Sequence, residues 1–232
     1  VPPPVARRAP RRRSSCTGRR LPATTLWAAV ACSGRLLGIA GADSLRNSLL
    51  SAAQERVDVW YADKSNVEAP QEKEGVSFQL SKEDKACGGD GVPLTFVEYD
   101  IEGARPVDVF NILANAREQV SWDPTVSKMD FLGDLESLQA RGFAGVFPAK
   151  GAPVPDREIF EWQFAKANFT TEEFWVVFSS IGNDELRQKE PMQKGAVEMQ
   201  NCMAAYKVSK TPKGAHVVNT QQVNSHPWPL TA

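Results

Sequence analysis

The chain has 232 residues, of which 42% are hydrophobic and 24% are charged. This is enough for one substantial domain, or for one domain with an appendage. The formal net charge of −1 hides an uneven distribution, because residues 1–42 hold eight arginines and no acidic residue. Residues 43–232 carry the other 19 basic residues against all 28 acidic ones, a net charge of −9. A body this acidic lacks the clustered cations of a nucleic-acid binder, so no nucleic-acid partner is expected.

The cysteines and histidines are too few and too scattered to indicate a metal centre. No C-x-x-C pair occurs among Cys16, Cys32, Cys87 and Cys202. We therefore expect neither a metal site nor a disulfide framework. Both histidines occur late in the chain, which disfavours zinc hydrolases and enzymes with a Ser–His–Asp triad. No P-loop or dinucleotide motif is present, so no cofactor is indicated.

Residues 1–42 are interpreted as a leader that precedes the folded domain. Its first half is rich in proline and arginine and has almost nothing to bury, which predicts disorder. The apolar run from Leu26 to Gly34 is far shorter than the ~20 residues of a membrane-spanning helix. The absence of acidic residues favours a mitochondrial or plastid transit peptide, whereas Ala40-Gly41-Ala42 would suit the cleavage site of a secretory signal. A tail without a targeting role is the third interpretation.

The folded domain, residues 43–232, is expected to begin with a helix. Asp43 or Ser44 is the candidate N-cap, and the helix runs to about Trp60. Residues 62–75 predict a loop or linker, and alternation predicts strands near 75–82 and 94–101. A second helix is expected from Pro106 to about Ala116. One apolar stripe of the first helix contains Leu45, Leu49, Ala52, Ala53, Val57 and Trp60.

The second half of the domain is expected to consist mainly of strands. Strand patterns occur at about 126–132, 137–147, 157–167, 172–180, 194–209 and 214–223, separated by turns. Short helices followed by a long antiparallel meander indicate the α+β class with a strongly curved sheet.

This order of elements resembles the START (steroidogenic-acute-regulatory-protein-related lipid transfer) family over about residues 45–232. Local similarities occur at 104–110 with Trp122-Asp123, at 155–160 and at 195–206. The resemblance implies a helix-grip fold, in which a curved antiparallel sheet and its helices surround an internal cavity. It implies a monomer that binds a phospholipid, sterol or sphingolipid and contacts membranes transiently. The family closes its cavity with a C-terminal helix, and this sequence stops at Ala232 before it; truncation and loss of this lid are both open.

Nine residues are candidates for the wall of that cavity. Along 157–167, alternation places Phe160 and Trp162 on the apolar face and Glu161 and Gln163 toward solvent. The resemblance instead turns Glu161 and Gln163 toward the cavity. It also places Gln163 where sterol-binding members carry an arginine, which argues against a charge-paired sterol site. The full set is Phe160, Glu161, Trp162, Gln163, Phe174, Trp175, Met199, Asn201 and Met203.

Three of these candidates share a predicted face with each other. Met199, Asn201 and Met203 lie at alternate positions of one long strand, where they line the cavity or pack in the core. The segment 174–178, FWVVF, is expected to be buried on both faces. Trp122 and Asp123 are expected to be structural, with the ring packed and the carboxylate capping a turn.

Two other functions are weighed against lipid binding. Helix-grip folds also host enzymes of the polyketide cyclase type, so fold alone does not exclude catalysis. The acid–base candidates form no recognisable set of nucleophile, base and orienting group, so no catalytic residue is predicted. A ligand-free scaffold with a filled interior is the other alternative. The acid–base candidates are Glu161, Glu198, Tyr206 and His216.

Overall fold

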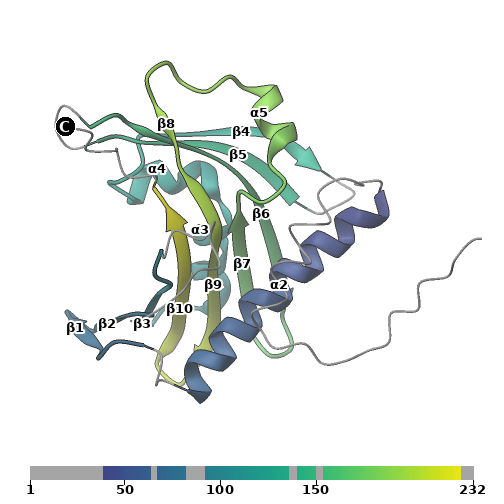
Figure 1. The fold of residues 1–232 in the computed structure, drawn as a ribbon. Helices are drawn as coiled ribbons and strands as arrows, with labels where there is room; N and C mark the ends of the chain where they lie inside the picture. Colours follow the sequence, from purple (N-terminus) through teal and green to yellow (C-terminus); the bar gives the residue numbers. More distant parts are fainter. Residues whose placement is uncertain (1–38, 64–66, 82–91, 136–139, 150–153, 226–232) are drawn as a thin grey trace, which may run out of the picture.

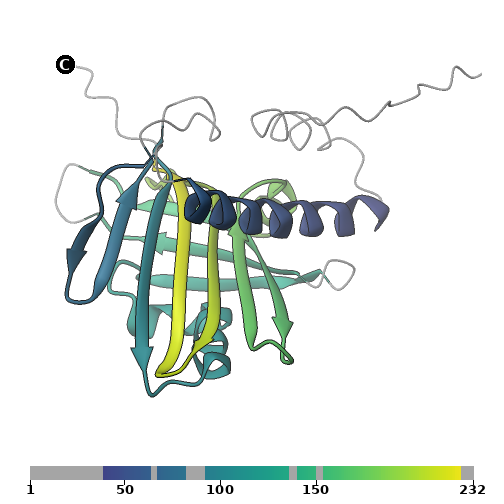
Figure 2. The ribbon, with the colours of Figure 1, turned by 90° about the horizontal axis from the view of Figure 1, so that it is seen from below.

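The computed structural model describes residues 39–63, 67–81, 92–135, 140–149 and 154–225. These residues form a ten-stranded sheet in the order β1-β2-β3-β10-β9-β7-β6-β5-β4, with β8 beside β6. The α+β helix-grip fold expected from the sequence is confirmed, and Figures 1 and 2 show how strongly the sheet curves. The elements are α2 (Ile39–Ala62), β1 (Gln71–Lys73), β2 (Val76–Leu80), β3 (Thr95–Glu102), α3 (Pro106–Ala114), η3 (Ala116–Glu118), α4 (Gln119–Trp122), β4 (Lys128–Leu135), β5 (Ala140–Phe147), β6 (Arg157–Asn168), β7 (Glu173–Ser179), α5 (Asp184–Lys189), β8 (Val197–Glu198), β9 (Gln200–Thr211) and β10 (Gly214–Asn224).

Helix α2 crosses one face of the sheet, which we call the outer face (Figure 2). The ring of Trp60 stacks on Phe96 with 4.9 Å between ring centroids. Its indole Nε1 donates a buried hydrogen bond of 2.9 Å to Gln79 Oε1. The predicted apolar stripe is confirmed, because all of its members belong to or pack against one core cluster: Leu45, Leu49, Ala52, Ala53, Val57 and Trp60.

The start of α2 differs from the prediction. The helix begins at Ile39, so Asp43 and Ser44 lie within it and neither begins it. It therefore crosses the expected boundary between leader and domain at residues 42 and 43. Residues 39–42 contain no proline, so each of them keeps the backbone N–H that a continuing helix needs. The rest of the expected leader, residues 1–38, lies outside the described residues.

Helix α3 packs on the opposite face of the sheet, which we call the inner face. Pro106 opens the helix as predicted, and Val109 and Leu113 are buried. The ring of Phe110 stacks on Phe174 of β7 with 5.0 Å between centroids. The sheet is thus covered by apolar side chains on both faces, which explains why the FWVVF segment is buried throughout. None of the described helices has the length and hydrophobicity that crossing a membrane requires.

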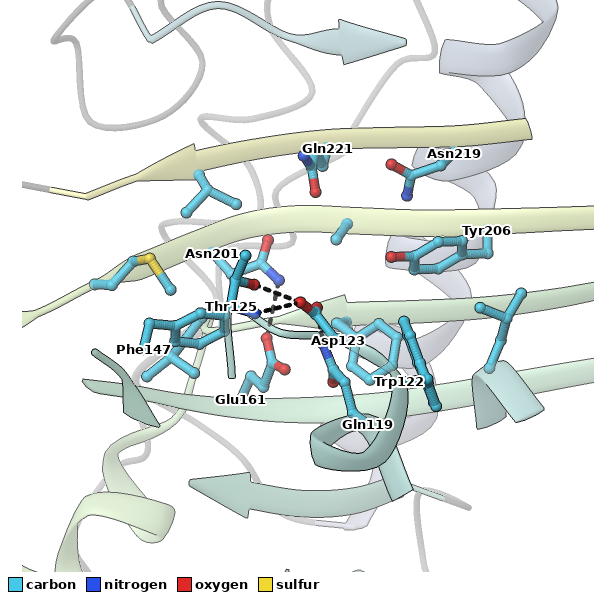
Figure 3. Close-up of a pocket in the computed structure, with 16 residues that line it drawn as sticks. Gln119, Trp122, Asp123, Thr125, Phe147, Glu161, Asn201, Tyr206, Asn219 and Gln221 are labelled. Carbon is cyan, nitrogen blue, oxygen red and sulfur yellow. Dashed lines mark hydrogen bonds between the residues drawn. The ribbon is translucent and has the colours of Figure 1, made fainter. Parts of the chain in front are cut away.

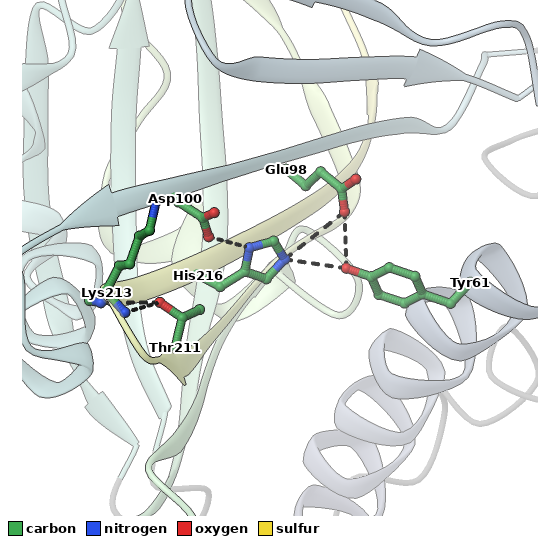
Figure 4. A network of polar contacts seen from close by, with 7 residues as sticks. Tyr61, Glu98, Asp100, Thr211, Lys213 and His216 are labelled. Carbon is green, nitrogen blue, oxygen red and sulfur yellow. Dashed lines mark hydrogen bonds and ion pairs between the residues drawn. The ribbon is translucent and has the colours of Figure 1, made fainter.

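A polar network fastens the end of α2 to the outer face of the sheet (Figure 4). Tyr61 donates a hydrogen bond of 3.0 Å to Glu98 on β3 and lies 3.4 Å from His216 Nε2 on β10. The Nδ1 atom of His216 lies 2.8 Å from Asp100 Oδ1. Burial first, and then the charge of Glu98, raise the pKa of Tyr61 above its ordinary value.

Two short elements occur where the sequence predicts loops or turns. Strand β1 lies within 62–75 and pairs with β2 through a two-residue turn, with φ of 53° at Glu74 and 80° at Gly75. All three β1 residues are exposed, so no alternation reveals the strand. Helix α5 follows the turn at Gly182, and its Leu186 packs so closely on Gly142 that a Cβ there would lie 2.3 Å from Leu186 Cδ2.

Candidate functional site

The inner face of the sheet holds a cavity of about 430 Å³ (Figure 3). Strands β5, β6, β7, β9 and β10 form its floor and wall, and α3, α4 and the corner after α4 contribute its other side. Its volume falls within the roughly 300–1,000 Å³ that small-molecule sites occupy. The residues that line it are Leu113, Gln119, Trp122, Asp123, Thr125, Phe147, Ile159, Glu161, Phe178, Met199, Asn201, Ala204, Tyr206, Asn219, Gln221 and Val223.

Strand alternation decides which side chains of β6 reach the cavity. Phe160 and Trp162 belong to the core beneath α2, on the outer face. Ile159 and Glu161 therefore point to the inner face and line the cavity. Glu161 is only 6% exposed and Gln163 only 3%, so the expectation from alternation that both side chains face solvent is wrong. The curved sheet is covered on both faces here, which an apolar/polar pattern alone does not reveal.

A register shift changes the alternation along β9. The pairing with β10 shifts between Gln222, opposite Met203, and Val223, opposite Asn201. The extra residue on β9 shifts by one position the alternation of its side chains between the two faces of the sheet. Met199 and Asn201 consequently line the cavity, whereas Met203 is fully buried in the outer-face core. The prediction that the three share one face is wrong for Met203.

A buried carboxyl–amide pair forms the polar floor of the cavity. Asn201 Nδ2 donates a hydrogen bond of 2.9 Å to Glu161 Oε2. Burial raises the pKa of Glu161 to about 7, and the hydrogen bond from Asn201 only partly opposes that rise. Ser180, which directly follows β7, fixes the backbone of Asn201, because Ser180 N–H donates to Asn201 O at 2.7 Å and Ser180 Oγ accepts from Asn201 N–H at 3.1 Å. The pair is therefore held by backbone geometry as well as by burial.

The corner after α4 contributes the second carboxyl. Asp123 Oδ1 accepts hydrogen bonds from the backbone N–H and the hydroxyl of Thr125, at 2.9 Å and 2.6 Å. Burial acts to raise the pKa of Asp123, but the hydrogen bonds from Thr125 and Gln119 outweigh burial and lower it. The predicted turn cap is thus present. The side chain of Trp122 is 44% exposed, so its ring lies at the rim of the cavity and not in the core.

Tyr206 of β9 completes the polar side of the cavity (Figure 3). Burial is the main reason that its pKa lies above the ordinary value, and Tyr99, Asp123 and Glu161 add to the effect. Asn219 and Gln221 lie beside it on β10. Asn219 and Gln221 were not among the candidates, although polar residues at alternate positions of a mostly buried strand are a signal that the sequence does contain.

The remaining candidates lie away from the cavity lining. Trp175 belongs to the outer-face core, like Phe160, Trp162 and Met203. Phe174 packs against α3 on the inner face, and Gln163 is buried there with its Nε2 lacking a hydrogen-bond partner among the described residues. Neither lines the cavity.

The acid–base candidates do not converge. Glu161 and Tyr206 line the cavity, but His216 belongs to the network beneath α2 on the outer face. Glu198 pairs with Arg187 of α5 through a hydrogen bond of 2.8 Å. Within the part of the chain that the structure describes, no group of three metal-ligating side chains comes together.

One cysteine corrects the expectation drawn from spacing. Cys202, 3% exposed on β9, is disulfide-bonded, and the other three cysteines lie outside the described residues. Sequence spacing alone does not reveal such a bond, because it depends on the distance between two cysteines in the folded chain.

No protein-family model matches the sequence, and no curated protein matches it at a significant level. Solved structures match its fold. Human StAR-related lipid transfer protein 5 has a TM-score of 0.63 at 14% identity, over 78% of this chain and 83% of that chain. Human STARD10 has a TM-score of 0.62 at 13% identity, over 76% and 67% of the two chains. The STAR-related lipid transfer protein from Xanthomonas axonopodis has a TM-score of 0.55 at 15% identity, over 69% and 82%.

Proposed function

From the helix-grip fold that the chain shares with START lipid transfer domains, we propose that the protein binds one lipid molecule in the inner-face cavity and exchanges it with membranes. The observation that carries the proposal is a cavity of about 430 Å³ whose lining combines apolar side chains with polar ones, including the buried pair Glu161 and Asn201. The neighbours named for lipid transfer support the same kind of ligand.

The walls suit an apolar chain or ring system. Phe147, Ile159 and Phe178 of β5, β6 and β7, together with Met199 between β8 and β9, line the apolar part of the cavity. Removing a lipid chain from water is favourable by roughly 0.8 kcal/mol per methylene group. The bilayer gives the chain the same stabilisation, so the cavity has to match it. The protein therefore needs a wall that replaces the bilayer, and aromatic and thioether side chains provide it.

The rim of the cavity offers a surface for membrane contact. Trp122 lines the cavity and is 44% exposed, and Val120 on the same short helix is 41% exposed. Tryptophan favours the interface between lipid and water, because its ring is apolar and its N–H is polar. A lipid that leaves the bilayer at this rim passes directly into the cavity.

We do not propose catalysis. Of the four acid–base candidates, only Glu161 and Tyr206 face the cavity. The cavity also argues against a scaffold with a filled interior.

A transfer assay tests the proposal. Donor vesicles carry a pyrene-labelled sterol, ceramide or phosphatidylcholine in separate experiments, and acceptor vesicles carry none. We expect the full chain to accelerate transfer of at least one label. Ala204→Phe, which fills the cavity from β9, should abolish the acceleration. Equal acceleration by the variant would place the activity elsewhere, and no acceleration by either protein would contradict a transfer function.

A further inference from the structure

The turn between β6 and β7 contains an acceptor sequence for N-glycosylation. Asn168-Phe169-Thr170 is the only N-x-S/T sequence in the chain, and its middle residue is not proline. Asn168 is the last residue of β6, and the turn that follows it covers residues 169–172. Such sequences also occur by chance, so the geometry of the turn and the compartment of the protein decide whether this one carries a glycan.

The side chain of Asn168 is exposed, and hydrogen bonds hold it by its oxygen only. Its Oδ1 accepts from the backbone N–H of Thr170 at 3.1 Å and from that of Thr171 at 3.2 Å. Among the described residues, Nδ2 of Asn168 takes part in no hydrogen bond. Phe169 and Thr170 are exposed as well. The nitrogen that would carry a sugar is therefore the unused end of the amide, at a surface position that has room for a bulky glycan.

A glycan on this turn does not block the cavity. The residues of β6 that line the cavity are Ile159 and Glu161. Asn168 lies at the far end of the same strand, roughly 20 Å from Glu161 at the usual rise per residue. Beside it, the ring of Phe169 is 70% exposed and packs edge-on against Phe174 with 5.5 Å between centroids. A hydrophilic glycan would shield this exposed aromatic ring from other apolar surfaces.

The disulfide bond of Cys202 indicates the compartment in which such a modification takes place. Cys202 is disulfide-bonded and only 3% exposed on β9. Disulfides form and persist in the endoplasmic reticulum and outside the cell, and they are rare in the cytosol. N-glycans are also added in the endoplasmic reticulum, so one compartment accounts for both features. This agrees with the secretory alternative for residues 1–42.

We propose that Asn168 carries an N-linked glycan. In the transfer, Nδ2 of Asn168 attacks C1 of the sugar at the reducing end of a lipid-linked oligosaccharide. The bond between C1 and the pyrophosphate oxygen breaks, and the lipid pyrophosphate leaves with the bonding electrons. Nδ2 gives up one proton, so the step needs neither an oxidant nor a reductant. The inference goes beyond lipid binding and does not depend on it.

Mass spectrometry of the natural protein tests the proposal. The protein is isolated from its source and digested with trypsin, which releases residues 167–187 as one peptide. Half of the digest is treated with a peptide N-glycosidase in heavy-oxygen water. We expect a glycopeptide in the untreated half, and in the treated half an aspartate labelled with heavy oxygen in place of Asn168. A peptide in which Asn168 is entirely unmodified would overturn the proposal.

Two neighbouring threonines provide matched variants. Both donate a backbone N–H to Asn168 Oδ1, but only Thr170 occupies the third position of the acceptor sequence. The full chain is expressed behind a secretory signal in cultured eukaryotic cells, and its gel mobility is compared before and after glycosidase treatment. Wild type, Thr171→Ala and the conservative variant Thr170→Ser should shift, whereas Thr170→Ala should not. No shift in wild type, or a shift in Thr170→Ala, would contradict a glycan on Asn168. Neither result bears on lipid binding, because the turn lies away from the cavity.

Discussion

The amide of Asn201 donates a hydrogen bond of 2.9 Å to the carboxyl of Glu161, across two strands of the inner face. The relationship joins β6 to β9, which are 40 residues apart at this point in the sequence. Because the carboxyl is buried, its pKa is raised to about 7 from the ordinary value of 4.5 for a glutamate. The protonation state of Glu161 therefore affects both the charge inside the cavity and the free energy of unfolding.

The first prediction concerns stability as a function of pH. Between pH 4.5 and 7 the unfolded chain releases the Glu161 proton and the folded chain keeps it, so this group lowers the free energy of unfolding as pH rises. The full effect above pH 7 is about 3 kcal/mol. Glu161→Gln should therefore be more stable than wild type at pH 8 by up to about 3 kcal/mol and nearly equal at pH 4. Urea unfolding at several pH values measures the difference, and parallel curves for the two proteins would rule out a buried, titrating carboxyl.

A second prediction uses two neighbouring alanines on β9. Ala204 lines the cavity, and Ala205 is packed in the outer-face core. Ala204→Phe has space to enter and should change the free energy of unfolding by less than about 1 kcal/mol. Ala205→Phe overfills a packed core and should destabilise the fold by about 1–3 kcal/mol. Chemical denaturation distinguishes them; comparable losses from both substitutions would mean that the cavity is not available space.

The turn between β9 and β10 gives a third prediction. A Cβ at Gly214 would lie 2.2 Å from the carbonyl oxygen of Ile101, which is backbone and has no freedom to move aside. Gly214→Ala should therefore destabilise the protein by about 3 kcal/mol. Lys213→Ala is the control, because Lys213 and Glu102 form an exposed pair worth less than about 1 kcal/mol. A melting temperature that is the same for both variants would contradict the close approach.

The network beneath α2 gives a fourth prediction (Figure 4). Tyr61→Phe removes the hydroxyl that donates to Glu98 and keeps the ring. We expect a loss of about 1 kcal/mol in the free energy of unfolding, the usual contribution of one hydrogen bond. Val59→Ala, at a 54% exposed position of the same helix, should have a smaller effect. A smaller loss from Tyr61→Phe than from Val59→Ala would show that the hydroxyl does not hold the helix end.

The sequence predicts the fold better than it predicts the cavity. Strands β6, β7 and β10 lie within two residues of their predicted limits, because alternating or continuously apolar segments bounded by turns are strong signals. Strand β1 was not predicted, because all its residues are exposed and no alternation reveals the strand. The order of the predicted elements was enough to predict a START-like arrangement, and solved structures share that fold.

The cavity lining depends on details that alternation does not contain. One extra residue on β9 places Met203 on the outer face, while Asn201 lies on the inner face and lines the cavity. Glu161 looks like a solvent residue in a pattern of alternating apolar and polar side chains, yet it is 6% exposed. Trp122 was expected to pack and instead lies at the rim. Bulges and two-sided burial are tertiary features, so residues that are correctly placed in a strand can still be assigned to the wrong face.

Native mass spectrometry of the full chain after incubation with mixed-lipid vesicles tests the central claim most directly. Ala204→Phe is measured in parallel as the variant with a filled cavity. The account predicts one lipid per wild-type chain, identified by its mass, and none on the folded variant. A folded wild-type chain that shows only its own mass would contradict lipid binding in this cavity.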